Sequence, residues 1–259
     1  MKFALVGYGK MGRAVEAAAL SQGYTLGPIV DRSGRNRRVV RTIGEASWRG
    51  VGVAFEFTEP GVAKDHVVEL LRRGIPVVCG TTGWDAEDAT VRRAARASTA
   101  GAVIAPNFSI GMGLFYAAVA DAARRYLMVG GYDPWVAEWH HRGKADAPSG
   151  TARRLAALVA GAGPAGASVC SGLPVAPIAP GDVHVVAIRA GSQSGRHLVG
   201  FDGPHDAVTF EHVARGREGF ADGALRAAAW LRGRRGLHGF DEVLDDLVRG
   251  QQRRGGRRR

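Results

Sequence analysis

Two patterns of apolar residues alternate through the first hundred residues of the chain. Compact apolar runs predict strands at Phe3–Gly7, Leu26–Asp31, Val51–Thr58, Ile75–Gly80 and Ala102–Ala105. Between them, apolar residues recur at helical spacing and predict helices at Met11–Ser21, Val62–Arg73 and Glu87–Ala97. Strands and helices alternating in this way are typical of βαβ units, and nearly continuous apolar strands are expected where helices cover both faces of a parallel sheet.

The pattern changes after Pro106, and the second half of the chain is richer in strands. Helices are predicted at Gly111–Arg125 and Thr151–Ala160, and strands at Trp135–Trp139, Val183–Arg189, His197–Phe201 and Ala207–Ala214. A helical pattern returns at Phe220–Leu231 and Phe240–Val248. Strand-rich sequence after a βαβ block predicts an α/β protein with a second domain of the α+β type.

A G-x-G-x-x-G motif lies between the first predicted strand and the first predicted helix, at Gly7-Tyr8-Gly9-Lys10-Met11-Gly12. In that context the first glycine permits a tight turn, the second lets a pyrophosphate approach the backbone, and the third lets helix and strand pack closely. The helix N-terminus also offers free N–H groups and the positive end of its dipole to phosphates. The motif therefore predicts a dinucleotide-binding loop.

The end of the second predicted strand leaves the choice of dinucleotide open. Asp31 lies where a carboxylate holds the ribose hydroxyls, which favours the unphosphorylated cofactor. Arg32 follows it and Lys10 lies in the loop, and either cation can meet a 2′-phosphate. Because ligands bind outside the carboxyl ends of parallel strands, two later turns are candidates to line a nicotinamide pocket, Gly80-Thr81-Thr82-Gly83 and Pro106-Asn107-Phe108-Ser109.

The segment from Glu138 to Thr151 concentrates the candidate chemistry. Its ionisable residues after the first are His140, His141, Arg142, Lys144 and Asp146. Ser149-Gly150-Thr151 leads into a predicted helix, whose N–H groups can receive a carboxylate. The lysine adds positive potential, and a histidine can move a proton near neutral pH. The segment therefore predicts a pocket for an acidic substrate.

Two other kinds of site are disfavoured. His140, His141 and Asp146 are metal-ligand types, but adjacent residues on a strand point to opposite faces and Lys144 would repel a cation, so we expect no metal. The chain has no G-x-S-x-G motif of the hydrolase kind. Its only two cysteines lie 91 residues apart, which favours free thiols in a reducing compartment over structural zinc.

Composition and charge narrow the class of protein further. Hydrophobic residues make up 46% of the chain and charged residues 23%, as in ordinary globular proteins, and no apolar run is long enough to span a membrane. The short apolar start leads directly into the glycine-rich loop rather than into a signal-peptide cleavage site, so we expect a cytoplasmic protein.

The net charge of +11 is partly a property of the C-terminus. The last eleven residues carry six Arg, and without them 29 basic residues face 24 acidic ones, a net charge of +5. The tail has no interleaved aromatic residues, so we expect no specific nucleic-acid partner.

The chain resembles the 4-hydroxy-tetrahydrodipicolinate (dihydrodipicolinate) reductase family over nearly its whole length. The motifs that carry the resemblance are Val6–Gly12, Phe55–Thr58, Gly80–Trp84, Pro106–Gly111, Glu138–Thr151, Arg189–Gly191, Gly195–His197 and Phe220–Ala224. The most specific of them is the block His140-His141-x-x-Lys144-x-Asp146-Ala147-Pro148-Ser149-Gly150-Thr151-Ala152.

The resemblance implies an architecture and an activity. A Rossmann-like parallel-sheet domain, residues 1–107 with 218–248, would enclose in sequence a mixed-sheet α+β domain, residues 108–217, that binds substrate and builds a homotetramer. Residues 249–259 would form a disordered basic tail. The implied activity is NADH- or NADPH-dependent reduction of the cyclic imine 4-hydroxy-tetrahydrodipicolinate to tetrahydrodipicolinate, in the diaminopimelate route to lysine.

The resemblance also implies the roles of single residues. His140 would be a proton donor and acceptor, Lys144 a second proton donor, and His141, Gly150 and Thr151 the groups that bind a substrate carboxylate. Cofactor contacts are implied at Gly7–Gly12, Asp31, Arg32, Gly80, Thr81, Thr82, Ala105, Pro106, Asn107 and Phe108.

Two alternatives keep the same motifs. A paralogue could reduce a different cyclic imine in specialised metabolism and would retain every residue named above. A catalytically idle protein that binds only a nucleotide or nucleic acid is disfavoured, because His140 and Lys144 are both present.

Overall fold

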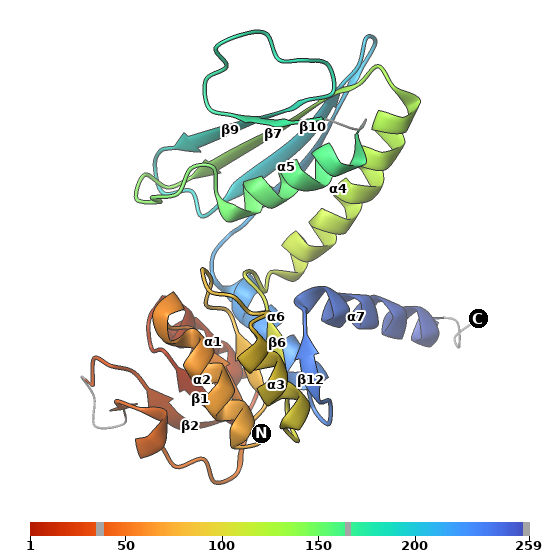
Figure 1. The fold of residues 1–259 in the computed structure, drawn as a ribbon. Coiled ribbons are helices and arrows are strands. Elements are labelled where there is room, and N and C mark those ends of the chain that lie inside the picture. Colours follow the sequence, from red (N-terminus) through yellow and green to blue (C-terminus); the bar gives the residue numbers. More distant parts are fainter. Residues whose placement is uncertain (35–38, 164–166, 256–259) are drawn as a thin grey trace. The chain divides into compact units, whose positions relative to one another are not determined.

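The structure is a computed structural model that describes residues 1–34, 39–163 and 167–255, with the backbone alone for residues 251–255 (Figure 1). The chain divides into two compact units, Met1–Ile110 with Arg217–Arg259, and Gly111–Gly216. The first unit is therefore built from both ends of the chain, and the second from its middle.

The first unit contains a seven-stranded sheet in which every neighbouring pair is parallel. The strand order is β12 (Gly236–His238), β6 (Gly101–Ile104), β5 (Val77–Cys79), β4 (Val51–Glu56), β1 (Lys2–Val6), β2 (Thr25–Val30) and β3 (Val39–Val40). A short 3-10 helix, η1 (Ile43–Glu45), precedes β4.

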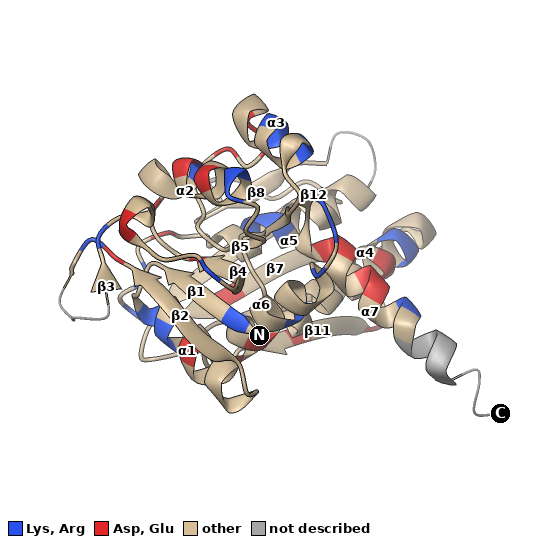
Figure 2. Ribbon diagram, turned by 90° about the horizontal axis from the view of Figure 1, so that it is seen from below, with Lys and Arg blue, Asp and Glu red and all other residues tan. Residues whose placement is uncertain are grey.

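Helices cover both faces of this sheet. Since successive residues of a strand point to opposite sides, alternate residues pack against different helices. Phe3 and Leu5 of β1 pack in one core cluster with α1 (Lys10–Ser21), α6 (Glu218–Trp230) and the first residues of α7 (Phe240–Gly255). Ala4 and Val6 pack in a second cluster with α2 (Pro60–Arg72) and α3 (Ala89–Ala97). Figure 2 shows basic and acidic residues interspersed on α2 and acidic residues at the start of α7.

The second unit contains a five-stranded mixed sheet. The strand order is β11 (Ala207–Val213), β10 (Arg196–Asp202), β7 (Asp133–His140), β9 (Val183–Arg189) and β8 (Val169–Ser171). The central strand β7 runs antiparallel to β10 and parallel to β9. The helices α4 (Ile110–Val129) and α5 (Gly150–Ala162) pack on one face, around a core that includes Val136, Val185, Val199 and Phe201.

The opposite face of the second sheet is open. Trp139, Val186 and Ile188 point away from the core, and their side chains are 38%, 41% and 44% exposed. In the part of this unit that the structure describes, both helices contribute to the core on the other side. The parallel α/β domain and the mixed α+β domain expected from the sequence are both confirmed.

The structure differs from the sequence-based expectation in its short strands and at the C-terminus. β3, β8 and β12 were not expected, since two or three residues are too few to show a period. The backbone of α7 continues to Gly255, whereas disorder was expected from Arg249. Gln and Arg are good helix formers, so the helix extends past its last apolar residue. Residues 256–259 lie outside the described residues.

Candidate active site

The glycine-rich loop joins β1 to α1, and its three glycines have different surroundings. Gly7 has a φ of 93°, and a Cβ there would lie 2.2 Å from the backbone oxygen of Phe57. A Cβ on Gly12 would lie 2.2 Å from the backbone oxygen of Gly7, so packing excludes side chains at both positions. Gly9 precedes α1, and a Cβ there would meet nothing within 4 Å. The loop therefore leaves open space beside a helix N-terminus, which fits a dinucleotide pyrophosphate.

Asp31 follows β2, and its carboxylate is hydrogen-bonded to the glycine-rich loop. Oδ2 accepts a hydrogen bond from the backbone N–H of Tyr8 at 2.7 Å, and Oδ1 accepts from the backbone N–H and hydroxyl of Ser33 at 2.8 and 2.6 Å. Burial raises the pKa of the Asp31 carboxyl, but the hydrogen bonds outweigh burial and hold that pKa below its ordinary value. The neighbouring Arg32 forms an exposed ion pair with Glu59, with Nη2 and Oε2 2.7 Å apart. Asp31 is therefore ionised beside the loop, and Arg32 shares its charge with Glu59.

A fully buried carboxylate, Glu56 at the end of β4, anchors the turn that follows β5. Its Oε2 accepts from the hydroxyl of Thr81 at 2.6 Å, and that hydroxyl accepts from the backbone N–H of Thr58 at 2.8 Å. A Cβ on Gly80 would lie 2.1 Å from the ring of Phe57, so only glycine allows this close approach. The sequence analysis gave Glu56 no role.

The remaining residues with a predicted cofactor role lie along the same edge of the sheet. Ala105 and Phe108 are buried after β6, Pro106 and Thr82 are exposed, and the side chain of Asn107 accepts from the backbone N–H two residues on, at 2.8 Å. Since β6, β5, β4, β1 and β2 are neighbours in a parallel sheet, their carboxyl ends bring the predicted cofactor residues together.

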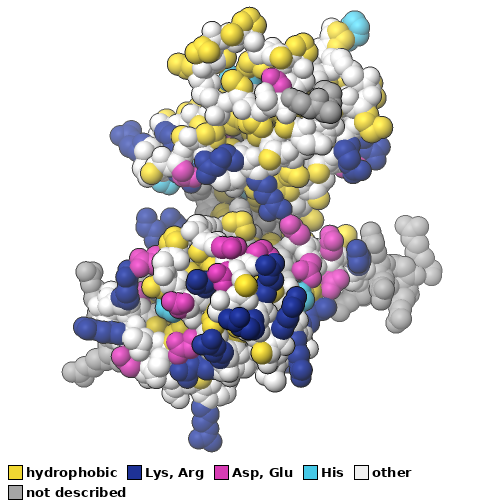
Figure 3. All heavy atoms as spheres, in the orientation of Figure 1, with side chains coloured by type: hydrophobic (Ala, Val, Ile, Leu, Met, Phe, Trp, Pro, Cys, Tyr) yellow, Lys and Arg dark blue, Asp and Glu magenta, His cyan; other side chains and the backbone are white. Residues whose placement is uncertain are grey.

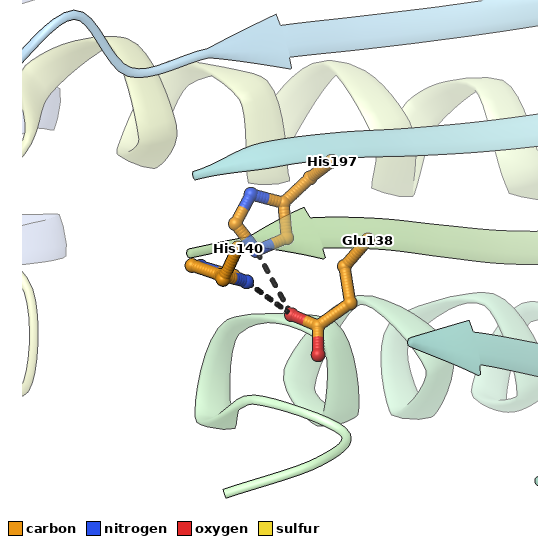
Figure 4. A group of neighbouring side chains, drawn as sticks. All are labelled: Glu138, His140 and His197. Carbon is orange, nitrogen blue, oxygen red and sulfur yellow. Dashed lines mark ion pairs between the residues drawn. The ribbon is translucent and has the colours of Figure 1, made fainter. Parts of the chain in front are cut away.

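In the second unit, β7 carries two ionisable side chains that point to the same face. Glu138 and His140 are two positions apart on the strand, and they are 1% and 8% exposed. Strand pairing brings two further residues beside them, because β10 sets His197 opposite Glu138 and β9 sets Arg189 opposite His140. Figure 4 shows both imidazole rings directed at the Glu138 carboxylate.

The carboxylate of Glu138 is surrounded by positive and N–H groups. Oε2 lies 3.1 Å from Nδ1 of His140 and 3.6 Å from Nε2 of His197. Oε1 lies 2.7 Å from Nη2 of Arg189 and accepts from the backbone N–H of Ser149, also at 2.7 Å. Burial raises the pKa of Glu138, but the two histidines, Ser149 and Arg189 outweigh it and hold that pKa far below its ordinary range. Burial is the main cause that lowers the pKa of His197.

The loop after β7 carries the other residues with a predicted substrate role. Nζ of Lys144 lies 2.7 Å from Oδ1 of Asp146, and its backbone N–H donates to the carbonyl oxygen of His141 at 3.1 Å. His141 is exposed. Gly150 and Thr151 begin α5, and a Cβ on Gly150 would meet nothing within 4 Å, so the helix start is open on that side.

Three of these side chains also have the arrangement of metal ligands. The ligand atoms of Glu138, His140 and His197 all lie within 4.8 Å of one another. This trio differs from the set of His140, His141 and Asp146 considered from the sequence. Because the guanidinium of Arg189 already neutralises the Glu138 carboxylate, a cation here would meet positive charge. The carboxylate is therefore already paired with a cation of the chain itself.

The sequence analysis missed the residues that support His140. Glu138 lies on the strand with His140, and the period of two on a strand was enough to place both on one face. Arg189 and His197 lie in motifs quoted for the family resemblance, but only the pairing of β9 and β10 with β7 shows what they contact.

A glycine-rich loop of the dinucleotide-binding kind on a parallel sheet, in a chain whose second sheet carries a buried Glu–His cluster, defines the class of protein as a nicotinamide-dependent oxidoreductase. The family model for the N-terminus of dihydrodipicolinate reductase matches residues 1–108, and the model for its C-terminus matches residues 111–244. The chain therefore belongs to the dihydrodipicolinate reductase family, which confirms the resemblance.

Named relatives agree with this assignment. The 4-hydroxy-tetrahydrodipicolinate reductase of Thiobacillus denitrificans is 35% identical over 256 residues, which cover 91% of this chain and 95% of the relative. That of Chromobacterium violaceum is 34% identical with the same coverage. Among solved structures, the dipicolinate-bound dihydrodipicolinate reductase of Paenisporosarcina sp. TG-14 has a TM-score of 0.76 at 22% identity, covers 94% of this chain and 99% of that one, and supports the fold.

Proposed function

We propose that the protein catalyses NAD(P)H-dependent reduction of 4-hydroxy-tetrahydrodipicolinate to tetrahydrodipicolinate, in the diaminopimelate route to lysine. One observation carries this proposal. A short stretch of chain contains His140, whose ring lies against the Glu138 carboxylate, then Lys144, and then the open N-terminus of α5. Relatives that bear the name of this activity match over nine-tenths of the chain, so the alternative of a paralogue with another substrate is not favoured.

The cofactor is proposed to bind at the carboxyl edge of the parallel sheet. The backbone of the loop from Gly7 to Gly12 binds the pyrophosphate, and Asp31 binds the ribose hydroxyls while Arg32 is available for a 2′-phosphate. The turns at Gly80–Thr82 and Ala105–Phe108 line the nicotinamide side. Both NADH and NADPH are proposed as cofactors, and when bound either one supplies the hydride.

The proposed substrate is a cyclic imine with two carboxylates, and the site offers positively charged and N–H groups to bind such an anion. His141 and the N–H groups of Gly150 and Thr151 bind a carboxylate at the start of α5. The ammonium group of Lys144, which pairs with Asp146 in the structure, adds positive potential near that carboxylate. An acidic ring is therefore held in a fixed orientation by groups that belong to one loop and one helix start.

The chain's own residues handle the protons. Loss of the 4-hydroxyl group as water gives the conjugated imine and requires a proton for the leaving oxygen. Addition of a hydride then builds negative charge on the ring, positioned N–H donors stabilise that charge, and the resulting enamine takes up a proton. Lys144 donates one proton, and His140 donates or accepts the other at its ring nitrogen. Both protons come from side chains whose positions are set by ion pairs, with Asp146 and Glu138 respectively.

The open face of the second sheet is proposed to pack against other copies of the chain and to build a homotetramer. Trp139, Val186 and Ile188 form an apolar patch there, and large exposed apolar patches mark interaction surfaces. In the view of Figure 3, hydrophobic side chains lie among charged ones on the surface of both units.

The cellular location is proposed to be the cytoplasm, where amino-acid biosynthesis takes place. Among the described residues, no helix is both long and apolar enough to cross a membrane.

A coupled assay tests the proposed activity. Dihydrodipicolinate synthase generates the unstable substrate in place, and the loss of reduced cofactor is followed by absorbance with NADH and with NADPH. We expect oxidation of the cofactor only when the synthase and both of its substrates are present. Absence of turnover with both cofactors, in a protein that binds either one, would overturn the proposal.

A further inference from the structure

We propose that Glu138 is a positioning residue that fixes the tautomer and the ring orientation of His140, so that Nε2 of His140 is the atom that exchanges the proton. This inference rests on the proposed function, since it assigns the working atom of a residue in that reaction. Glu138 is 1% exposed, so its effect on the reaction comes through His140 rather than through contact with the substrate.

The side chains of Glu138 and His140 are in direct contact. Nδ1 of His140 lies 3.1 Å from Oε2 of Glu138, and the side chain of Glu138 is 0% exposed. The contact is an ion pair without hydrogen-bond geometry, and a negatively charged oxygen 3.1 Å from Nδ1 still favours a proton over a lone pair on that nitrogen. Nδ1 therefore carries a proton in both the neutral and the charged ring, and in the neutral ring Nε2 is left as the basic nitrogen.

Gly195 lies beside Nε2, the second nitrogen of the His140 ring. A Cβ on Gly195 would lie 3.1 Å from Nε2 of His140, and Gly195 has a φ of 151°. A side chain at position 195 would therefore crowd the nitrogen that the carboxylate leaves free. Glycine at position 195 therefore leaves room beside Nε2 that any other side chain would fill.

Arg189 and the backbone N–H of Ser149 stabilise the negative charge of Glu138. Arg189 binds Oε1 from β9 and also donates to the backbone oxygen of Asp146, in the loop after β7. The backbone N–H of Ser149 donates to the same Oε1. One buried carboxylate thus joins β7, β9 and the start of α5, and these partners hold its pKa far below its ordinary range.

His197 provides the second imidazole ring beside the Glu138 carboxylate. Its ring centroid lies 5.0 Å from that of His140 at an interplanar angle of 75°, so it packs edge-on and limits rotation of the catalytic ring. Burial lowers the pKa of His197, and the charges of His140 and Lys144 lower it further, against the opposing effect of Glu138. His197 is therefore neutral near neutral pH and leaves the Glu138 charge to His140 and Arg189. His212 on β11 is the next ionisable group, and its own pKa is also lowered by burial.

The proposed arrangement and a metal site differ in the location of one proton. Metal binding through Nδ1 of His140, the nitrogen that lies 3.1 Å from the carboxylate, would require an unprotonated Nδ1, whereas the positioning role requires a protonated one. A measurement of the tautomer therefore decides between them without any assumption about turnover.

The test combines NMR spectroscopy and kinetics on the full chain. In uniformly 15N-labelled wild type, long-range 15N–1H spectra should show His140, assigned by its loss in His140→Asn, with the proton on Nδ1. Glu138→Gln should produce a mixture of tautomers. It should lower kcat by about 10²-fold, the scale of a misdirected acid–base group, and leave KM for substrate and the affinity for NADH within about threefold.

The controls keep each outcome decisive. Glu69→Gln breaks an exposed Glu–Arg pair with Arg73 on α2 and should behave like wild type. A wild-type His140 with its proton on Nε2 would overturn the inference even if Glu138→Gln failed to fold. So would a Glu138→Gln enzyme with unchanged kcat, or one equivalent of Zn²⁺ shifting both ring signals in wild type. If wild type proves inactive in the coupled assay, the proposed function fails, while the tautomer still tests the structural claim.

Discussion

The guanidinium of Arg32 and the carboxylate of Glu59 meet at 2.7 Å, beside the position where the ribose of a dinucleotide is expected. Asp31, the residue before Arg32, is bonded to the glycine-rich loop. Asp31 therefore favours the unphosphorylated cofactor, while Arg32 can bind a 2′-phosphate only if its ion pair with Glu59 breaks.

We expect the enzyme to use both nicotinamides with a preference below about 20-fold, because Asp31 and Arg32 act in opposite directions. Initial rates over a titration of each reduced cofactor, at saturating substrate, measure the ratio of the two kcat/KM values. A preference above about 1,000-fold in either direction would show that only one of the two side chains takes part.

Replacing Glu59 should shift that ratio toward NADPH. In Glu59→Gln the Arg32 guanidinium loses its anionic partner, so we expect KM for NADPH to fall about threefold, the scale of an exposed ion pair, with KM for NADH unchanged. Glu87→Gln, which breaks the exposed pair with Arg92, is the matched control. Equal changes for both cofactors would contradict the assignment of Arg32 to the phosphate.

Lys144→Ala should abolish most of the turnover and spare cofactor binding. Loss of a positioned proton donor typically costs a factor of about 10² to 10⁴ in kcat. The affinity for NADH, measured by fluorescence titration, should not change, because the predicted cofactor residues lie on the other sheet. Lys64→Ala removes a lysine paired with Asp88 on the surface and serves as control. A Lys144→Ala enzyme within about threefold of wild type would exclude the role.

The stability of the protein should fall as the pH falls through the range in which His197 titrates. Burial lowers the pKa of His197 in the folded state, so the fold favours the neutral ring. Its contribution is complete above the unfolded pKa of about 6.5 and declines below it, since the unfolded chain then binds the proton more readily. We expect Tm to fall between about pH 7.5 and 5.5, and to fall less steeply in His197→Asn. His205→Asn, at an exposed position, should keep the wild-type slope.

Removal of Arg249–Arg259 should leave activity and assembly unchanged. The residues that anchor α7 are Phe240, Val243 and Leu244, all upstream of the deletion, so the helical backbone seen as far as Gly255 is not needed for the core. We expect rates within about twofold of the full chain in the coupled assay and the same mass by light scattering. Dissociation of the truncated protein would mean that the tail docks on a neighbouring subunit.

The parts of the fold that follow from the sequence are those with a local signal. The loop from Gly7 to Gly12 could be read because three glycines, a strand and a helix stand next to one another, and the structure gives each glycine a different packing reason. His140 and Lys144 could be singled out because they lie in one dense segment. Glu138 could have been added from the alternation along β7.

The rest required pairing between distant segments. Arg189 is 51 residues from Glu138, and no periodicity shows that β9 sets it beside that carboxylate. The edge strand β12 has three residues and pairs with β6, more than 130 residues earlier, so its place follows from the sheet rather than from its own composition. The end of α7 was misjudged for a different reason, since polarity and charge were taken as disorder although they are compatible with a solvated helix.

The nucleotide-binding unit is assembled from both ends of the chain, and this has a consequence for its synthesis on the ribosome. When the first 110 residues have emerged, Phe3, Leu5 and Phe55 still lack α6, whose Ala224 and Leu225 belong to the same core cluster in the finished protein. β6 is then an unpaired edge, because β12 has not been made. The nascent unit therefore exposes an apolar face while the middle unit is translated, and it can close only near the end of translation. We expect the emerging chain to depend on holding chaperones during this interval.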